Sequence, residues 1–180
     1  WIIGSYHNIF RIGKILQDLN FWILNDVIWA KSNPLPNFRA TRLTNAHETL
    51  IWCSKKPKSK YQFNYHTLKV ANEDRQERSI WNFPICSGKE RLKNNKKQTA
   101  HPTQKPLALM KKIIIQSSIQ GDLVLEPFAG TASFCAEAKY LGRNYIGFEK
   151  DETYFNLAIK RLKKIKSLKN DLLEINEKDK

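Results

Sequence analysis

The chain has 180 residues, of which 41% are hydrophobic and 27% charged, a composition typical of a globular fold rather than a disordered or fibrous chain. This length suits one domain, or one domain with a small appendage. Lys and Arg number 31 against 17 Asp and Glu, which gives a net charge of +14 and favours a polyanionic partner, although a Lys-rich proteome would give the same surface. The apolar runs are shorter than the roughly 20 residues of a membrane span, so no membrane partner is expected.

The cysteines indicate a reducing compartment. Cys53, Cys86 and Cys135 are odd in number and lack the spacing of a disulfide framework or a zinc site, so we expect no metal and a cytoplasmic location. The first residue is Trp1 and the only methionine is Met110, so we expect a segment upstream of Trp1.

The first part of the chain alternates strand and helix patterns. Apolar and branched residues predict strands over 1–4, 21–29 and 48–53, and an apolar stripe predicts a helix over 10–19. Prolines and asparagines over 31–37 predict a loop, and a solvated basic run covers 55–60. Residues 61–100 show little periodicity.

Regular patterns return after residue 100. We expect helices over 107–118, 134–141 and 152–165, a short buried strand over 123–126 and another strand over 144–149, followed by a charged tail. A strand, a glycine loop, a helix and a second strand ending in an acid are typical of a nucleotide-binding α/β unit. Gly130 would let a ligand approach the backbone, and Glu149 stands where a carboxylate accepts hydrogen bonds from ribose hydroxyls. A plain turn with a surface acid is the alternative. No P-loop sequence is present, so nucleoside triphosphate chemistry is not indicated.

Three segments together resemble the β-class DNA amino-methyltransferases, the restriction-modification enzymes that methylate exocyclic amines with S-adenosylmethionine. They occur in the order peculiar to that class: Asn33-Pro34-Leu35-Pro36-Asn37 through His47-Glu48-Thr49-Leu50-Ile51-Trp52, then His101-Pro102-Thr103-Gln104-Lys105-Pro106, then Glu126-Pro127-Phe128-Ala129-Gly130-Thr131. The resemblance extends to about residue 164. It implies an α/β, Rossmann-like methyltransferase fold with a mostly parallel sheet and a small irregular target-recognition insert.

The resemblance also implies a cofactor site. Phe128, Ala129 and Gly130 would form the wall of the pocket, with Thr131 beside them, and Glu149 would hold the ribose. Thr103 and Lys105 would lie near the methionine end, where Lys105 suits the cofactor carboxylate. His101 has no catalytic role in this interpretation and is a candidate for loop packing.

The chain departs from the family pattern in two places. The usual loop Asp-Pro-Phe-x-Gly-Ser/Thr-Gly has Glu126 for its acid and Ala132 for its last glycine, a change that helical torsions would tolerate. The catalytic tetrapeptide, Asp/Asn/Ser-Pro-Pro-aromatic, occurs nowhere in the 180 residues. We therefore predict no catalytic residue in this chain, and we expect it to be an inactive C-terminal piece when alone.

The remaining predictions concern DNA and organisation. The resemblance implies duplex DNA as substrate, for which we expect contacts from Arg39, Arg42, Lys89, Arg91 and Lys93. We divide the chain into a catalytic-half remainder (1–60), a target-recognition region (61–100), a cofactor-binding half (101–169) and a charged tail (170–180), and we expect Trp81 and Phe83 to be core of the small recognition lobe.

The predicted activity is methylation of adenine N6. N4-cytosine methylation, a non-catalytic specificity subunit and an RNA methyltransferase are the alternatives, and a homodimer or a cognate restriction endonuclease would be partners.

Overall fold

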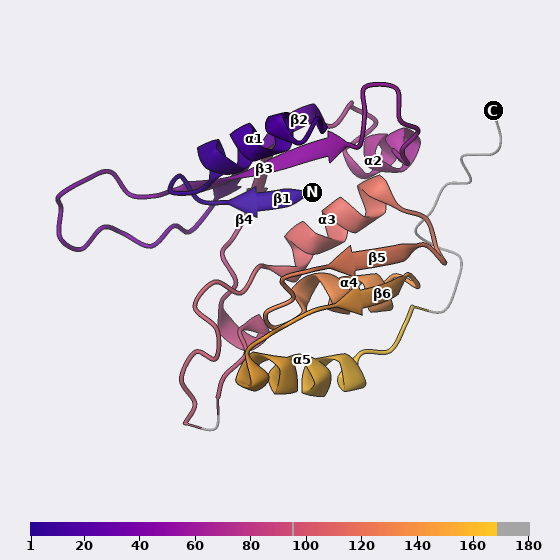
Figure 1. Ribbon diagram of the computed structural model, residues 1–180. Coiled ribbons are helices and arrows are strands. Elements are labelled where there is room, and N and C mark those ends of the chain that lie inside the picture. The colour runs from indigo at the N-terminus through magenta and orange to yellow at the C-terminus, as the bar shows by residue number, and fades with distance from the viewer. Residues whose placement is uncertain (95, 169–180) are drawn as a thin grey trace. The chain divides into compact units, whose positions relative to one another are not determined.

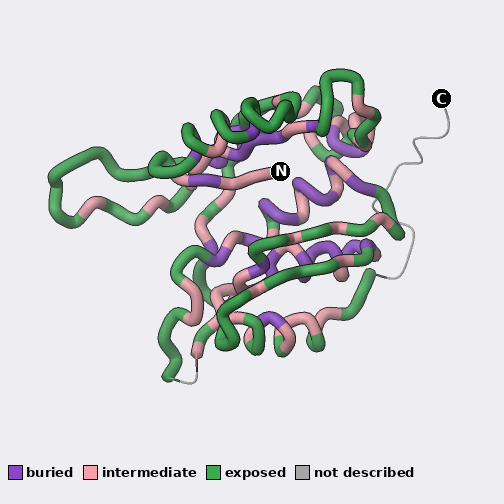
Figure 2. The backbone as a smooth tube through the Cα atoms, viewed as in Figure 1, coloured by how far each residue is buried: buried purple, intermediate pink, exposed green. Residues whose placement is uncertain are grey.

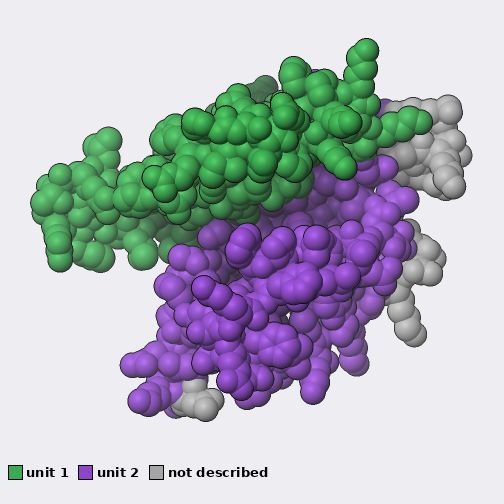
Figure 3. Space-filling view, viewed as in Figure 1, with its two compact units in different colours: residues 1–61, 77–85 green, residues 62–76, 86–180 purple. Residues whose placement is uncertain are grey.

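The computed structural model describes residues 1–94 and 96–168 (Figure 1). The chain divides into two compact units, one formed by residues 1–61 and 77–85 and the other by residues 62–76 and the chain from 86 onward (Figure 3). The segment 61–100 is thus shared between both units rather than forming a lobe of its own. The predicted charged tail, 170–180, lies outside the described residues.

The first unit is built on a mixed sheet of four strands in the order β1-β3-β2-β4. β3 (His47–Ser54) runs antiparallel to both β1 (Ile2–Gly4) and β2 (Trp22–Lys31), and β4 (Ile80–Phe83) runs parallel to β2. The three strands expected in this part of the chain are confirmed. β4 was not predicted, because its four residues lie within the segment that shows little periodicity.

The core of this unit lies on both faces of the sheet. α1 (Ile9–Asp18) buries Ile9 and Leu16 against Ile51, as its apolar stripe predicted. Trp1 stacks on Trp52, with ring centroids 5.3 Å apart and planes 1° from parallel. Trp81 is 3% exposed and belongs to β4, so it is a core residue of the sheet and not of a separate recognition lobe.

The second unit contains the strand, loop and helix pattern expected of a nucleotide-binding fold. β5 (Leu123–Glu126) and β6 (Asn144–Gly147) are parallel and are connected by α4 (Ser133–Tyr140). α3 (Leu107–Ser117) packs on α4, α5 (Glu152–Lys164) follows β6, and α2 (Tyr65–Ala71) packs on α3. Asp151 caps α5 by accepting a hydrogen bond from the Tyr154 N–H at 3.0 Å.

The α/β class is confirmed, but the pairings differ from the expected mostly parallel sheet. Two described strand pairs are parallel and two are antiparallel. The antiparallel pairs arise because β2 returns directly into β3 through the loop 32–46, without a crossover helix.

The expectation of a buried strand over 123–126 is correct for one face only. Val124 and Tyr145 pack against Ile114, Ala138 and Leu141, whereas Leu123 is 61% and Leu125 57% exposed. Figure 2 shows the same contrast between the buried helices α3 and α4 and the largely exposed strands β5 and β6. Among the described residues, no helix combines the length and apolar character needed to cross a bilayer.

Candidate cofactor-binding site

The loop after β5 has a backbone that bends twice into the left-handed region. Gly130 and Ala132 both have φ of 54°, and Ala132 directly precedes α4. A Cβ at Gly130 would lie 3.3 Å from His101 Nε2, so glycine suits this position in both torsion and space. Ala132 was expected to have right-handed helical torsions, which tolerate a methyl group. Its backbone is left-handed instead, so that expectation is wrong.

Glu149 joins the ends of the two parallel strands. Its Oε2 accepts a hydrogen bond from the Gly130 N–H at 2.7 Å, and its Oε1 accepts one from the Asp151 N–H at 2.9 Å. Each carboxylate oxygen has two lone pairs, so each can accept one further hydrogen bond from a ligand hydroxyl. Gly130 and Glu149, both expected at the cofactor site, are therefore joined directly by a hydrogen bond.

His101 places the segment 101–106 against the glycine loop. Its ring lies edge-on to the ring of Tyr154, with centroids 4.5 Å apart, and its Nδ1 accepts a hydrogen bond from the Thr103 N–H at 3.2 Å. Burial, with a smaller contribution from the Lys105 charge, lowers the pKa of His101 and favours the neutral ring that can accept this bond. His101 thus contacts both Tyr154 and the backbone of its own segment.

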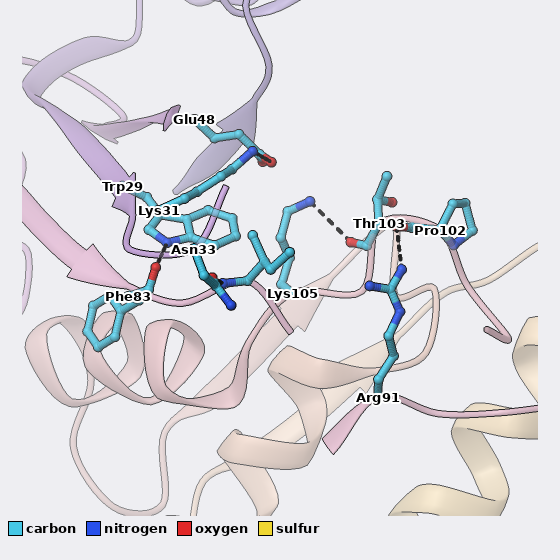
Figure 4. Close-up of polar contacts among 10 residues, drawn as sticks. Trp29, Lys31, Asn33, Glu48, Phe83, Arg91, Pro102, Thr103 and Lys105 are labelled. Carbon is cyan, nitrogen blue, oxygen red and sulfur yellow. Dashed lines mark hydrogen bonds and ion pairs between the residues drawn. The ribbon is translucent and has the colours of Figure 1, made fainter. Parts of the chain in front are cut away.

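Thr103 and Lys105, on the same segment, are joined by a hydrogen bond between side chain and backbone (Figure 4). The Lys105 ammonium donates a hydrogen bond to the Thr103 carbonyl at 3.2 Å, and the Thr103 residue is exposed. An ammonium has three donors, so a bound carboxylate can share this group with the carbonyl.

The other predicted wall residues divide into exposed and buried ones. Phe128 is 89% exposed and offers a free ring face, as does Phe148 at 59%. Ala129 and Thr131 are buried, and the Ala129 N–H donates to the Phe148 carbonyl at 2.8 Å. These two residues therefore contribute to the loop through packing and backbone contacts.

Gln104 is a supporting residue that the sequence reasoning missed. Its side-chain amide donates to the Glu90 carbonyl at 2.9 Å, and its side-chain oxygen accepts from the Leu92 N–H at 3.0 Å. The Glu90 carboxylate in turn accepts from the Leu107 N–H at 2.5 Å, at the start of α3. The available signal was the position of Gln104 inside the 101–106 motif, between residues already assigned to the site.

Arg161 is the second missed residue. From α5, its guanidinium donates to the Thr131 carbonyl at 3.1 Å and to the Ser133 hydroxyl at 3.0 Å, on either side of Ala132. Burial lowers the pKa of Arg161, as expected for a charge held beneath a loop. An arginine three residues after Ala158, on the buried face of an amphipathic helix, was the signal in the sequence.

The acid at the end of β5 lies in a nonpolar setting. The Cys135 thiol donates to Glu126 Oε2 at 3.4 Å. Burial raises the pKa of Glu126 to about 7 and that of Cys135 to about 12. Glu126 therefore takes up a proton more readily than an ordinary carboxylate.

The residues predicted to contact DNA lie in both units. Arg39 and Arg42 are exposed in the β2–β3 loop (residues 32–46) of the first unit. In the second unit Lys89 and Lys93 are exposed. Arg91 instead donates to the Cys86 carbonyl at 3.2 Å and to the Pro102 carbonyl at 3.2 Å, and the second of these contacts is drawn in Figure 4. Arg91 thus links the backbone at Cys86 to the 101–106 motif at Pro102.

Comparison with known proteins places these features in a family. A family model described as DNA methylase matches residues 1–160. The chain is 55% identical over 172 residues to the type II methyltransferase M.HinfI of Haemophilus influenzae, covering 96% of this chain and 48% of that protein. It is 41% identical to the type II methyltransferase M2.MboI of Moraxella bovis, covering 95% of this chain and 61% of that protein. The chain therefore spans about half to three-fifths of the length of these relatives.

Solved structures agree with the sequence matches. The crystal structure of an M1.HpyAVI–SAM complex superposes with a TM-score of 0.72 at 37% identity, covering 89% of this chain and 72% of that one. The PvuII DNA methyltransferase, described as cytosine-N4-specific, has a TM-score of 0.69 at 19% identity over 87% of this chain and 57% of that one, which supports the fold. The match over residues 1–160 and the M1.HpyAVI similarity show that this chain belongs to the DNA methylase family.

Proposed function

We propose that this chain carries the cofactor-binding part and DNA-facing loops of an S-adenosylmethionine-dependent DNA methyltransferase whose acceptor is the N6 amine of adenine. The observation that carries the proposal is the Glu149 carboxylate, which fixes Gly130 and Asp151 and keeps acceptor capacity on both oxygens. The chain belongs to a family in which one similar solved structure, that of M1.HpyAVI, is a complex with S-adenosylmethionine. The resemblance of the sequence motifs covers enzymes that methylate adenine or cytosine, and of these two acceptors we propose adenine N6, with cytosine N4 as the alternative.

The residues at the site match the chemistry of S-adenosylmethionine in three respects. Its ribose hydroxyls are donors that suit the free lone pairs of Glu149. Its carboxylate suits the Lys105 ammonium, and its adenine suits the exposed faces of Phe128 or Phe148. When bound, the cofactor supplies a methyl group on a sulfonium, ready for transfer to a nucleophile.

This chain's own residues bind and orient in the proposed reaction. Arg161, His101 and Glu149 hold the loop that receives the cofactor, through the hydrogen bonds and ring contact described above. The tetrapeptide that would accept hydrogen bonds from the target amine is not among the 180 residues. The proposed division is therefore that this chain holds the methyl donor, and that a tetrapeptide supplied by another segment holds the acceptor.

Duplex DNA is the proposed substrate, and it requires cationic contacts as well as base extrusion. Arg39, Arg42, Lys89 and Lys93 are exposed and suited to phosphate, and the expectation that Arg91 also contacts DNA competes with its two carbonyl partners. Residues 61–100 remain the proposed target-recognition region. A homodimer, a cognate restriction endonuclease and a cytoplasmic location are the accompanying proposals.

The test combines cofactor binding with product analysis. Tritiated S-adenosylmethionine and mixed-sequence duplex DNA are incubated with this chain and with the chain extended by whatever its reading frame encodes upstream of Trp1. Methyl transfer by a protein that contains the tetrapeptide, with N6-methyladenine in the digest, supports the proposal. N4-methylcytosine in the digest would instead show that the methylated base is cytosine. DNA binding without cofactor binding would favour the specificity subunit instead, and preference for structured RNA would favour an RNA methyltransferase.

A further inference from the structure

The β2–β3 loop is fixed at its base. The Lys31 ammonium lies 3.0 Å from the Glu48 carboxylate, with both side chains mostly buried, and the Asn33 side-chain oxygen accepts a hydrogen bond from the Ile85 N–H at 2.7 Å (Figure 4). Further along the loop, Arg42 donates to the Tyr6 hydroxyl and lies 5.6 Å from the centre of the Tyr6 ring. The loop therefore has a defined path, although it extends well beyond its two strands (Figure 1).

A turn in this loop presents an aromatic ring beside an arginine. The Ala40 N–H donates to the Asn37 carbonyl at 2.9 Å, which puts Phe38 and Arg39 at the two central positions. The Asn37 side chain holds the turn, accepting from the Arg39 N–H at 3.2 Å and donating to the Arg42 carbonyl at 2.8 Å. The turn is thus ordered by hydrogen bonds that leave the Phe38 ring 89% exposed.

The loop exposes three large apolar side chains that are not buried by packing within the first unit. Leu35 is 68% and Leu43 91% exposed, in addition to Phe38. A cluster of exposed apolar side chains of this kind indicates a surface used for binding. The loop also curls around an open hollow of about 580 Å³, lined by these apolar residues together with Arg39 and Arg42.

The charge of the loop indicates the chemistry of the partner. Between residues 32 and 46 there are two arginines and no acidic residue. A partner must therefore offer anionic groups next to flat apolar surfaces. Duplex DNA with one base step opened offers both, because the phosphates flank bases whose faces have lost their stacking partner.

We infer that Phe38 is a wedge that enters the base stack of duplex DNA next to the extruded nucleotide, while Arg39 and Arg42 contact the flanking phosphates. This inference rests on the proposed function, because an enzyme that extrudes its target base leaves a vacancy that a ring can fill. The Asn37 turn and the ion pair at the base keep the ring presented before DNA arrives, which lowers the entropic cost of ordering it on binding.

The test compares two probes by fluorescence anisotropy over a range of salt concentrations. One is a mixed-sequence duplex, and the other is the same duplex with a single abasic site, where the stack is already interrupted. The full chain should bind the abasic duplex more tightly. Phe38→Ala should weaken that binding by roughly tenfold and remove the preference, since base–aromatic stacking contributes strongly to such contacts. Phe38→Trp should retain the preference.

Two controls separate the ring from the charges and from general apolar surface. Phe10→Ala removes another exposed phenyl ring of the same unit, 81% exposed on α1, and should leave both affinities unchanged. Arg39→Ala should retain the preference for the abasic duplex and reduce the slope of log affinity against log salt by about 0.9, the value for one lost phosphate contact.

Three outcomes overturn the wedge. If Phe38→Ala and Phe10→Ala have the same DNA affinity while the parent chain binds both DNA and S-adenosylmethionine, the wedge is wrong and the proposed function stands without it. Sedimentation showing that Phe38→Ala abolishes self-association with unchanged DNA affinity would make this loop a contact between two copies. A parent chain that binds neither DNA nor S-adenosylmethionine would remove the proposed function together with the wedge.

Discussion

The carboxylate of Glu149 accepts a hydrogen bond from the main-chain N–H of Gly130 at 2.7 Å, across the carboxyl ends of two parallel strands. The same carboxylate accepts from the Asp151 N–H, one residue before α5 begins. One side chain therefore fixes the loop after β5 and the loop after β6 relative to each other.

Glu149→Ala should loosen both loops even without a ligand. Loss of two hydrogen bonds to a charged acceptor should lower the free energy of unfolding by about 1–3 kcal/mol, since the freed N–H groups can partly turn to water. Hydrogen exchange measured by mass spectrometry should be faster in peptides containing Gly130 and Asp151. Glu152→Ala, which removes an exposed carboxylate three residues away, is the matched control and should leave the Gly130 peptide protected.

Ala132→Gly should be nearly neutral for stability. The substitution loses a buried methyl group and adds freedom to the unfolded chain, but it relieves a left-handed torsion that costs an L-residue about 1–2 kcal/mol. Ala136→Gly, in the right-handed interior of α4, loses a buried methyl with no such relief and should cost about 1 kcal/mol or more. Equal losses in urea denaturation of the two variants would contradict the strain at Ala132.

Gly147→Ala should destabilise the second unit by contact with α4. A Cβ at this position would lie 2.9 Å from Cys135 Sγ and 3.3 Å from Ala129 Cβ, so the neighbours must shift. Overpacking of this kind typically costs about 1–3 kcal/mol. Adding Cys135→Ala should restore part of the loss, and a double-mutant cycle with no coupling between the two positions would refute the contact.

The contribution of Glu126 and Glu137 to the stability of the protein should fall as the pH rises from about 4.5 to about 7. Burial raises the pKa of both Glu126 and Glu137 to about 7, so in this window the folded state holds more protons than the unfolded state. Their contribution is therefore greatest below the ordinary glutamate pKa and decreases through the folded one. Glu126→Gln should make the decrease shallower in urea titrations, and adding Glu137→Gln should make it shallower still. An unchanged slope in Glu126→Gln would show that Glu126 is ionised in the folded state.

Gln104→Ala should release the segment before the 101–106 motif. The Leu92 N–H and the Glu90 carbonyl would both lose their side-chain partner. Hydrogen exchange should increase in the peptide that contains Leu92 and remain unchanged in α4. Gln120→Ala, at an exposed turn of the same unit, is the control.

The elements that the sequence predicted correctly are those with strong local patterns. α1 and the β5–α4–β6 unit were evident from apolar periodicity and from the glycine loop, because these features depend on neighbours within a few residues. β4 was missed because it is held by pairing with β2, about 50 residues earlier in the chain. The exposed face of β5 was missed because an apolar run does not reveal which of its faces is covered.

Residues of the candidate site could be predicted where a local sequence pattern marks them. Gly130 was singled out from the glycine loop and Glu149 from the acid that ends the next strand, and a hydrogen bond joins the two. Gln104, Glu90 and Arg161 act on backbone groups elsewhere in the chain, and such partners follow from the tertiary fold rather than from spacing. The left-handed torsion of Ala132 also could not be inferred, since alanine normally prefers a right-handed conformation.

The central claim is best tested by calorimetric titration of S-adenosylmethionine into this chain and into its Glu149→Ala and Glu152→Ala variants. We expect S-adenosylmethionine to bind at one site per chain. Glu149→Ala should lower the affinity by roughly tenfold to a hundredfold, because it removes the charged partner of the ribose hydrogen bonds. Glu152→Ala should leave the affinity unchanged. DNA affinity should be the same in all three proteins. An affinity unaltered by Glu149→Ala would contradict the assignment of Glu149 to the site. Absence of binding to the parent chain would contradict the proposal that this chain binds S-adenosylmethionine.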